Sequence, residues 1–317
     1  MPQSGRLRAR VLAAILGVAA VSSGCAVLPI VTRNIGNTFR TPDPVPHKLA
    51  HPVRKDARLA VLWVGHATCL VQMDDKFILT DPVFTTTVGQ VARRLVEPGL
   101  EPSALPRIDA VLISHMHPDH LSLGSLEMLE PKISHLALPR GGLTYLTDFS
   151  FDAFELGTWE AWEQDGLRIT AVPVKHVGFR YGIDDAWNLD AFTGYVVEYH
   201  GLRVYFGGDT AYDDRAFLET ARRFPNVDVA LLPIAPAEPR ELMRRTHIGP
   251  EEAVQVFLDL GAKVVVPIHR DTFFNSTDER GVALARFLAE AKAKKLPDGS
   301  VQVIGFGEQK VLVPVEK

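Results

Sequence analysis

Seven consecutive residues carry most of the recognisable chemistry of this chain: Ser114-His115-Met116-His117-Pro118-Asp119-His120. They follow directly on the apolar run 110–113, which predicts a buried strand. Residues i and i+2 of an extended segment face the same side, so His115 and His117 can chelate one ion. The proline then turns the chain and brings the aspartate and the third histidine toward a second ion. Because imidazole and carboxylate ligands suit Zn²⁺, the stretch predicts two zinc ions, although other divalent metals fit the same ligands.

Three further candidate ligands follow apolar, strand-like runs later in the chain. In α/β folds the active site lies at the ends of such strands, so side chains in these positions meet. Each of them alone is as well explained by a structural role, but the set together with the histidine-rich stretch favours metal ligation. They are His176 after the run 169–174, Asp209 after 204–208, and His269 after 264–268.

The rest of the sequence alternates apolar strand-like runs with amphipathic helical segments, which predicts an α/β fold. The clearest helix is expected at 251–260, because Pro250 suits its first position and Gly261 ends it. Further helices are expected at 121–129 and 281–294. Strands are expected at 59–64, 68–73, 77–80, 109–114, 133–138, 167–174, 195–199, 204–206, 229–233 and 264–268.

The N-terminus has the features of an export signal. Arginines at positions 6, 8 and 10 precede an apolar run of 11 residues at 11–21, and small residues then lead to Cys25. This arrangement resembles a bacterial lipoprotein signal over residues 1–24, which implies an acylated Cys25 and a protein tethered to a membrane of the bacterial cell envelope, facing the periplasm. An ordinary secretory signal and an uncleaved anchor are the alternatives. Residues 25–56 are rich in proline and lack a clear period, so they are expected to form a tether and a wrapping segment.

Composition excludes several classes of protein. Of 317 residues, 46% are hydrophobic and 23% are charged, which is ordinary for a globular chain. A net charge of −4 gives no electrostatic case for binding nucleic acid. Two cysteines cannot form a disulfide scaffold. Nothing in the sequence indicates the oligomeric state.

The histidine-rich stretch, with the three downstream ligands, resembles the metallo-β-lactamase superfamily. That resemblance implies a four-layer αβ/βα sandwich for the hydrolase domain at 57–317, with a binuclear metal site between its two halves. It also implies the division of ligands between the ions. His115, His117 and His176 would hold one zinc, Asp119, His120 and His269 the other, and Asp209 would bridge the two.

A closer resemblance is to the N-acylphosphatidylethanolamine-hydrolysing phospholipase D family. It rests on the segments 63–68, 81–84 and 206–212, and above all on Glu238-Pro239-Arg240 followed by His247 and the segment 250–254. It implies cleavage of a phospholipid phosphodiester by a metal-bridging hydroxide, with Asp119 and His247 as catalytic residues and His247 not a ligand. The sequence departs from the family at Pro118, where an aromatic residue is expected.

Alternatives to this function remain open. A lactonase or another carbonyl hydrolase on the same scaffold would have the same ligands, because substrate choice depends on the pocket. A non-catalytic lipoprotein that binds metal or lipid is a third reading. His66 and Asp81 are expected either to orient metal ligands through hydrogen bonds or to be, respectively, a core histidine and a turn former.

Overall fold

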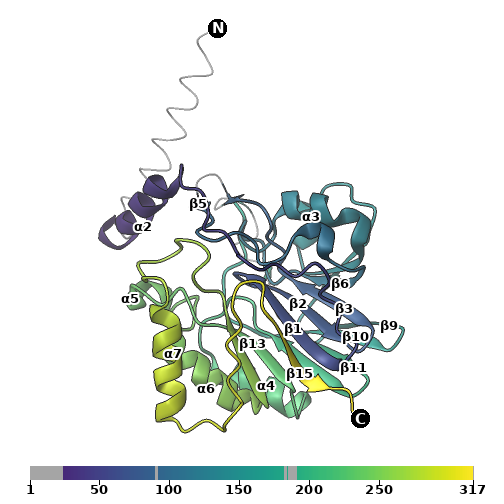
Figure 1. The fold of residues 1–317 in the computed structure, drawn as a ribbon. Coiled ribbons are helices and arrows are strands. Elements are labelled where there is room, and N and C mark those ends of the chain that lie inside the picture. Colours follow the sequence, from purple (N-terminus) through teal and green to yellow (C-terminus); the bar gives the residue numbers. More distant parts are fainter. Residues whose placement is uncertain (1–23, 90–91, 182–183, 185–190, 317) are drawn as a thin grey trace.

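Two β-sheets packed face to face form the body of the protein in the computed structural model, and helices cover their outer sides (Figure 1). The structure describes residues 24–89, 92–181, 184 and 191–316. This is the predicted αβ/βα sandwich. The strands of both sheets begin as antiparallel meanders and continue in parallel, so that each half repeats the same plan.

The first sheet has seven strands in the order β15-β1-β2-β3-β6-β7-β8. Strands β3, β6, β7 and β8 run parallel, and the others pair antiparallel. The bounds are β15 (Gln309–Pro314), β1 (Ala57–Gly65), β2 (Thr68–Met73), β3 (Lys76–Thr80), β6 (Ile108–Leu112), β7 (Ile133–Pro139) and β8 (Asp152–Leu156).

The second sheet has six strands in the order β14-β13-β12-β11-β10-β9. Strands β12, β13 and β14 run parallel. The bounds are β14 (Val264–Ile268), β13 (Val229–Pro233), β12 (Leu202–Phe206), β11 (Gly194–Tyr199), β10 (Leu167–Val172) and β9 (Ala161–Gln164). A separate hairpin joins β4 (Thr87–Val88) to β5 (Ala92–Arg93).

Three apolar clusters hold these layers together. The inner cluster lies between the sheets and includes Trp63, Ile169 and Phe206, all fully buried. A second cluster packs α3 (Leu123–Leu129) against the first sheet, and a third packs α6 (Pro250–Leu260) and α7 (Val282–Ala293) against the second. Burial on both faces explains why the strands read as continuous apolar runs rather than as alternating ones.

The predicted helices lie within two residues of α3, α6 and α7. Local signals produce the match at α6: Glu252 accepts a hydrogen bond from the Gly249 amide, and Gly261 ends the helix with φ +59°. Sequence reasoning did not predict α4 (Asp214–Arg223), the short α5 (Arg240–Met243) or the edge strands β8, β9 and β15. The edge strands are short and only partly buried, and α4 buries only Phe217 and Thr220, which gives it a narrow apolar face.

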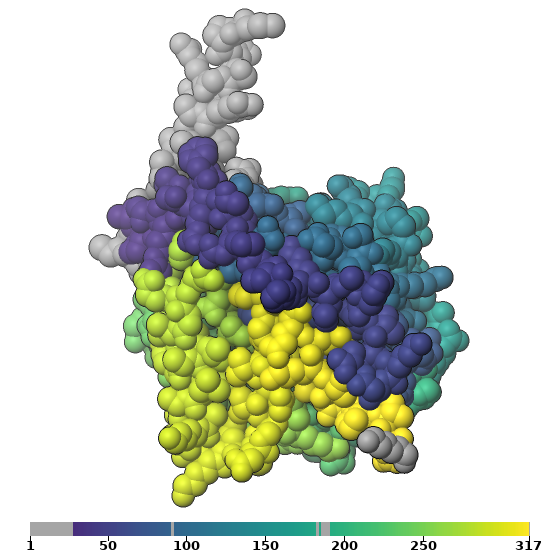
Figure 2. Space-filling view, in the orientation of Figure 1, coloured from purple at the N-terminus to yellow at the C-terminus, as the bar shows by residue number. Residues whose placement is uncertain are grey.

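The segment expected to be a tether contains a helix, α2 (Gly24–Asn37), in its first part. Tertiary contacts account for it, because Asn34 donates to the Phe274 carbonyl and Asn37 donates to the Arg93 carbonyl. Residues 38–56 then run across the surface beside the C-terminal strand (Figure 2), where Pro52 accepts a hydrogen bond from Gln309. Among the described residues, no helix is both long and apolar enough to cross a membrane.

One glycine allows the two halves to approach each other at the edge where the strands end. Gly208 has φ +56°, and a Cβ atom there would lie 2.3 Å from the Ser114 Cβ. A side chain at this position would separate the chain leaving β12 from the loop that follows β6. We therefore predict that Gly208→Ala lowers the free energy of unfolding by about 2–4 kcal/mol, through overpacking and backbone strain together.

Urea denaturation measures this loss. The matched control is Gly201→Ala, because Gly201 also has positive φ (+79°) but has no atom within 4 Å of the added Cβ. It should lose only about 1 kcal/mol, the cost of the strain alone. Equal losses in the two variants would show that the close approach to Ser114 does not contribute to the loss in the free energy of unfolding.

Candidate metal centre

All the predicted site residues except His247 lie just beyond the ends of strands, and these ends meet at one edge of the sandwich. In the first sheet, β1 leads to His66, β3 to Asp81 and β6 to the histidine-rich loop. In the second sheet, β10 leads to His176, β12 to Asp209 and β14 to His269. In chain order they are His66, Asp81, the loop His115–His120, His176, Asp209 and His269.

His115, His117 and His176 form a first group, whose ligand atoms lie within 4.8 Å of one another. Nε2 of His115 is 2.8 Å from Nδ1 of His117, and Nε2 of His176 is 3.4 Å from that same atom. The other nitrogens of two rings bond to the protein. Nδ1 of His115 meets the Ser114 hydroxyl, and Nδ1 of His176 meets the Thr246 carbonyl. These bonds fix the rings and leave the facing nitrogens free for a cation.

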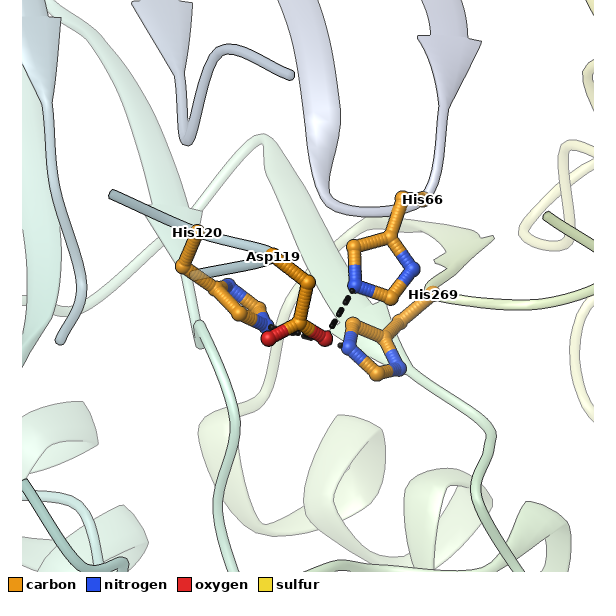
Figure 3. Close-up of side chains that lie close together, drawn as sticks. All are labelled: His66, Asp119, His120 and His269. Carbon is orange, nitrogen blue, oxygen red and sulfur yellow. Dashed lines mark hydrogen bonds and ion pairs between the residues drawn. The ribbon is translucent and has the colours of Figure 1, made fainter. Parts of the chain in front are cut away.

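His66, Asp119, His120 and His269 form a second group, whose ligand atoms also lie within 4.8 Å of one another, and their side chains point toward one another (Figure 3). Nε2 of His66 is 3.0 Å from the Asp119 carboxylate, and Nε2 of His120 is 3.2 Å from Nε2 of His269. Nδ1 of His269 bonds to the Ala235 carbonyl at 2.7 Å, which orients that ring. Four potential ligands from three separate segments therefore converge on one point.

The Asp209 carboxylate lies between the two groups. It is 3.1 Å from Nε2 of His269, 3.4 Å from Nε2 of His120 and 3.4 Å from Nδ1 of His247. One of its oxygens also lies within 4.8 Å of a ring nitrogen of His115 and of His176. This is where a bridging ligand is expected from the sequence, although the bridging role itself stays a prediction.

Unpaired polar atoms in the cluster fit bound cations. Oδ1 of Asp209 and Nδ1 of His247 are buried and have no hydrogen-bond partner among the described residues. A buried acceptor without a partner costs free energy comparable to a lost hydrogen bond, so such atoms rarely persist without a ligand. The donor set of imidazoles and carboxylates matches the preferences of divalent metal ions.

The protonation states suit metal binding as well. Burial lowers the pKa of His117 to about 4, that of His176 to about 3 and that of His269 to about 4. These rings are neutral at pH 7, which is the form that ligates a metal. His120 is the exception: burial acts in the same direction, but three nearby carboxylates, Asp209 foremost, raise its pKa well above the ordinary value, so this ring has to lose a proton before it can bind a metal.

Asp81 holds the histidine-rich loop from behind. It is fully buried, and its carboxylate accepts hydrogen bonds from the Ser114 amide at 2.7 Å and the Ser114 hydroxyl at 2.6 Å. It also lies 2.6 Å from Nδ1 of His120. The contact expected for an orienting residue is therefore present, and the effect of Asp81 on metal affinity stays a prediction.

His66 belongs to the ligand cluster itself. Sequence reasoning gave it an orienting role or a place in the core, but its Nε2 lies among the second group of candidate ligands. Its ring packs on that of His269 with centroids 3.8 Å apart, and its carbonyl accepts a hydrogen bond from the His269 amide. The signal in the sequence was weak, because a single histidine after a strand seldom marks a ligand.

His247 lies beside the cluster, in the loop between α5 and α6. Its nearest candidate ligands are Asp209 and His176, with which it could itself hold a metal. Burial lowers its pKa to about 4, and the side chain keeps 16% exposure. Cys25, the predicted acylation site, is distant in sequence from these residues and lies in the first turn of α2.

Comparison with known proteins agrees with this geometry. A family model described as "Beta-lactamase superfamily domain" matches residues 76–270. N-acyl-phosphatidylethanolamine-hydrolyzing phospholipase D 1 of Caenorhabditis elegans is 32% identical over 255 residues, covering 74% of this chain and 70% of that protein. A metal-dependent hydrolase of Methanoregula boonei is 30% identical over 257 residues, covering 80% and 97%. A solved metallo hydrolase from Ignicoccus hospitalis has a TM-score of 0.60 at 23% identity, covering 80% and 97%.

The position of Asp209 leads to a prediction about metal retention. Asp209→Asn keeps the shape of the side chain but removes the charge that both groups of histidines share. We expect metal affinity to fall by roughly 100-fold while the fold is retained. Metal content of the purified variant, measured by atomic emission, gives the result. Asp214→Asn, at an exposed carboxylate in the first turn of α4, should bind metal as the parent does; unchanged metal content in Asp209→Asn would rule out a bridging ligand.

Proposed function

Because this chain is a metal-dependent hydrolase of the metallo-β-lactamase superfamily, we propose that it is a phosphodiesterase of phospholipase D type. Its substrates would be phospholipids like N-acylphosphatidylethanolamine. Support comes from the similarity to the Caenorhabditis elegans phospholipase over three quarters of the chain. A lactone or β-lactam hydrolase would share the metal centre, so residues outside the ligand set have to distinguish these reactions.

The observation that carries the proposal is the bonding around Arg240. Its Nη2 donates to the His247 carbonyl at 2.9 Å and to the Glu252 carboxylate at 2.5 Å. Glu252 in turn accepts from the Gly249 amide and caps α6. The segment that carries the phospholipase resemblance therefore acts as one bonded unit, and that unit sets His247 against the metal centre.

The ligand groups above are those that would hold the metal ions in this proposal. Two divalent ions there would supply Lewis-acid stabilisation of the phosphate oxygens and a hydroxide nucleophile at neutral pH. The chain's own part is to fix the ligands before the substrate arrives. The Asp81 carboxylate orients the His120 ring by a hydrogen bond. The carbonyls of Thr246 and Ala235 orient the rings of His176 and His269 in the same way.

His247 would act on the leaving group. The ring is neutral at pH 7, since burial lowers its pKa to about 4. A neutral imidazole carries one N–H, which can donate a hydrogen bond to the oxygen on which negative charge develops as the phosphodiester breaks. The partial exposure of His247 and its distance of 3.4 Å from Asp209 support a place beside the scissile bond.

We expect the zinc-loaded protein to release phosphatidic acid and an N-acylethanolamine from N-acylphosphatidylethanolamine, and to leave lactones and β-lactams intact. Mass spectrometry of a bacterial lipid extract supplemented with this phospholipid would detect both products. An unchanged lipid profile from a protein with its metal ions bound would contradict the proposal. Turnover of a lactone would then favour the carbonyl hydrolase.

His247→Ala is the control that separates chemistry from metal binding. The variant should keep its metal ions and lose roughly 100-fold in rate, the usual effect of removing a group that acts on a reacting proton or anion. Loss of metal together with rate would identify His247 as a ligand instead.

We also propose that the protein is attached to a membrane through Cys25. The apolar side chains of Leu28, Ile35 and Phe39 support this, because they are 60%, 62% and 95% exposed on or just after the helix that carries Cys25. Exposed apolar groups beside an acylated residue would add to its hold on a lipid surface.

Cys25→Ser should move the protein from the membrane fraction to the soluble fraction, because the acyl chains would be lost. Immunoblotting of fractionated cells measures the distribution. Cys69→Ala is the matched control, since this buried thiol lies in the inner core and cannot reach a membrane. Full retention of Cys25→Ser in the membrane fraction would instead indicate an uncleaved apolar segment at 11–21.

A further inference from the structure

A pocket of about 470 Å³ adjoins the metal centre and has no part in the chemistry described so far. Pro118, which stands between His117 and Asp119, forms part of its wall. Other parts of the wall come from the β4–β5 hairpin, from the start of α3 and from Arg180 and Tyr181. The pocket therefore lies against the metal loop at Pro118, and none of the candidate ligands lines it.

Arg180 is tied to the metal loop but keeps unused hydrogen-bonding capacity. One guanidinium nitrogen, Nη1, donates to the carbonyls of Met116 at 3.0 Å and Leu121 at 2.8 Å, which lie on either side of the loop. Its Nε is buried and has no hydrogen-bond partner among the described residues. The guanidinium therefore has a donor that the bonds to the loop do not use.

Arg180 also has no counter-ion within the part of the chain that the structure describes. No carboxylate among the described residues forms an ion pair with its guanidinium, and none of those that line the pocket is acidic. The nearby Asp184 carboxylate accepts hydrogen bonds from the Tyr145 hydroxyl and from the backbone amides of Arg180 and Tyr181. A half-buried cation without a counter-ion favours binding of an anion.

Hydroxyl groups complete the lining. Thr85, Thr87 and Ser122 all border the pocket, and the Ser122 hydroxyl lies 3.3 Å from that of Thr85. Hydroxyls donate to anions and do not repel them. Together with the guanidinium they make a site with positive charge and several donors.

We propose that this pocket is a specificity site for a carboxylate or similar anionic group on the leaving side of the phosphodiester. The proposal rests on the phosphodiesterase function above and narrows it. Substrates that carry an anion two or three bonds from the scissile oxygen would be preferred over neutral counterparts. N-acylphosphatidylserine and N-acylphosphatidylethanolamine form such a pair, because they differ by one carboxylate on the carbon beside the nitrogen.

Binding gives the first test and needs no turnover. N-acetyl-O-phosphoserine and N-acetyl-O-phosphoethanolamine are soluble monoesters that differ by the same carboxylate. By isothermal titration on the metal-loaded full chain, we expect the serine compound to bind about tenfold more tightly, the usual gain from one charge-assisted hydrogen bond. Equal affinities would overturn the proposal.

Two variants at the hairpin isolate the charge without touching the metal loop. Thr87 is exposed on β4 and lines the pocket. Thr87→Glu places a carboxylate there, and Thr87→Gln has the same length without the charge. The preference for the serine compound should be at least fivefold smaller in the glutamate variant than in the glutamine variant; equal preferences in the two would count against the pocket.

Arg180 variants test the residue itself. Arg180→Gln should abolish the preference between the two phospholipids, mainly through a higher KM for the serine lipid, and Arg180→Lys should restore part of it. Metal content is measured in parallel, because Arg180 also holds the loop. A loss of kcat on both lipids with their ratio unchanged would mean that Arg180 is only a structural clamp.

The two proposals fail differently. If neither phospholipid is cleaved but the soluble pair still binds with a tenfold difference, the anion site stands and the phospholipase function falls. If both phospholipids are cleaved at equal rates and the soluble pair binds equally, the function stands and the anion site falls.

Discussion

A buried chain of three side chains, Asp81–His120–Asp209, joins the two halves of the molecule and positions the rest of the metal centre. Asp81 follows a strand of the first sheet and lies 2.6 Å from Nδ1 of His120, which follows another strand of that sheet. Asp209 follows a strand of the second sheet and lies 3.4 Å from Nε2 of the same ring. All three are almost fully buried. Burying such charges carries a desolvation cost that their attraction only partly offsets, so stability alone does not account for them. Their arrangement fits a role in orienting the candidate metal ligands.

The same edge of the sandwich holds unusual backbone conformations. His66, Asp81 and His269 have φ values of +54°, +31° and +58°, in a region that side chains other than glycine seldom adopt. Each costs of the order of 1 kcal/mol and persists because the surrounding contacts require it. These residues turn the chain sharply after β1, β3 and β14 and so direct their side chains into the cluster. Strain and buried charge therefore coincide at the metal centre.

Much of the centre could be predicted from the sequence because its signals are local. Each of the predicted ligands followed an apolar run or lay in one dense stretch, and strand ends meet at one edge of such a sheet. The features that could not be predicted depend on contacts between residues far apart in the sequence. The helix at 24–37 depends on hydrogen bonds from Asn34 and Asn37 to loops far along the chain. The place of His66 depends on the way the turn after β1 packs on His269, which no neighbouring residue indicates.

The parts that the sequence predicts, and the parts that it does not, have different tasks in the fold. Strand ends supply the candidate ligands, and these set the class of reaction. The walls of the pocket beside the metal loop come from the β4–β5 hairpin, from Pro118, from the start of α3 and from Arg180 and Tyr181. In the proposed function, substrate choice depends on these walls, and a metal motif shared with other hydrolases does not determine them. The preference for a particular phosphodiester therefore depends on residues outside the ligand set: Arg180, which lines the pocket, and Arg240, which bonds to the carbonyl of His247.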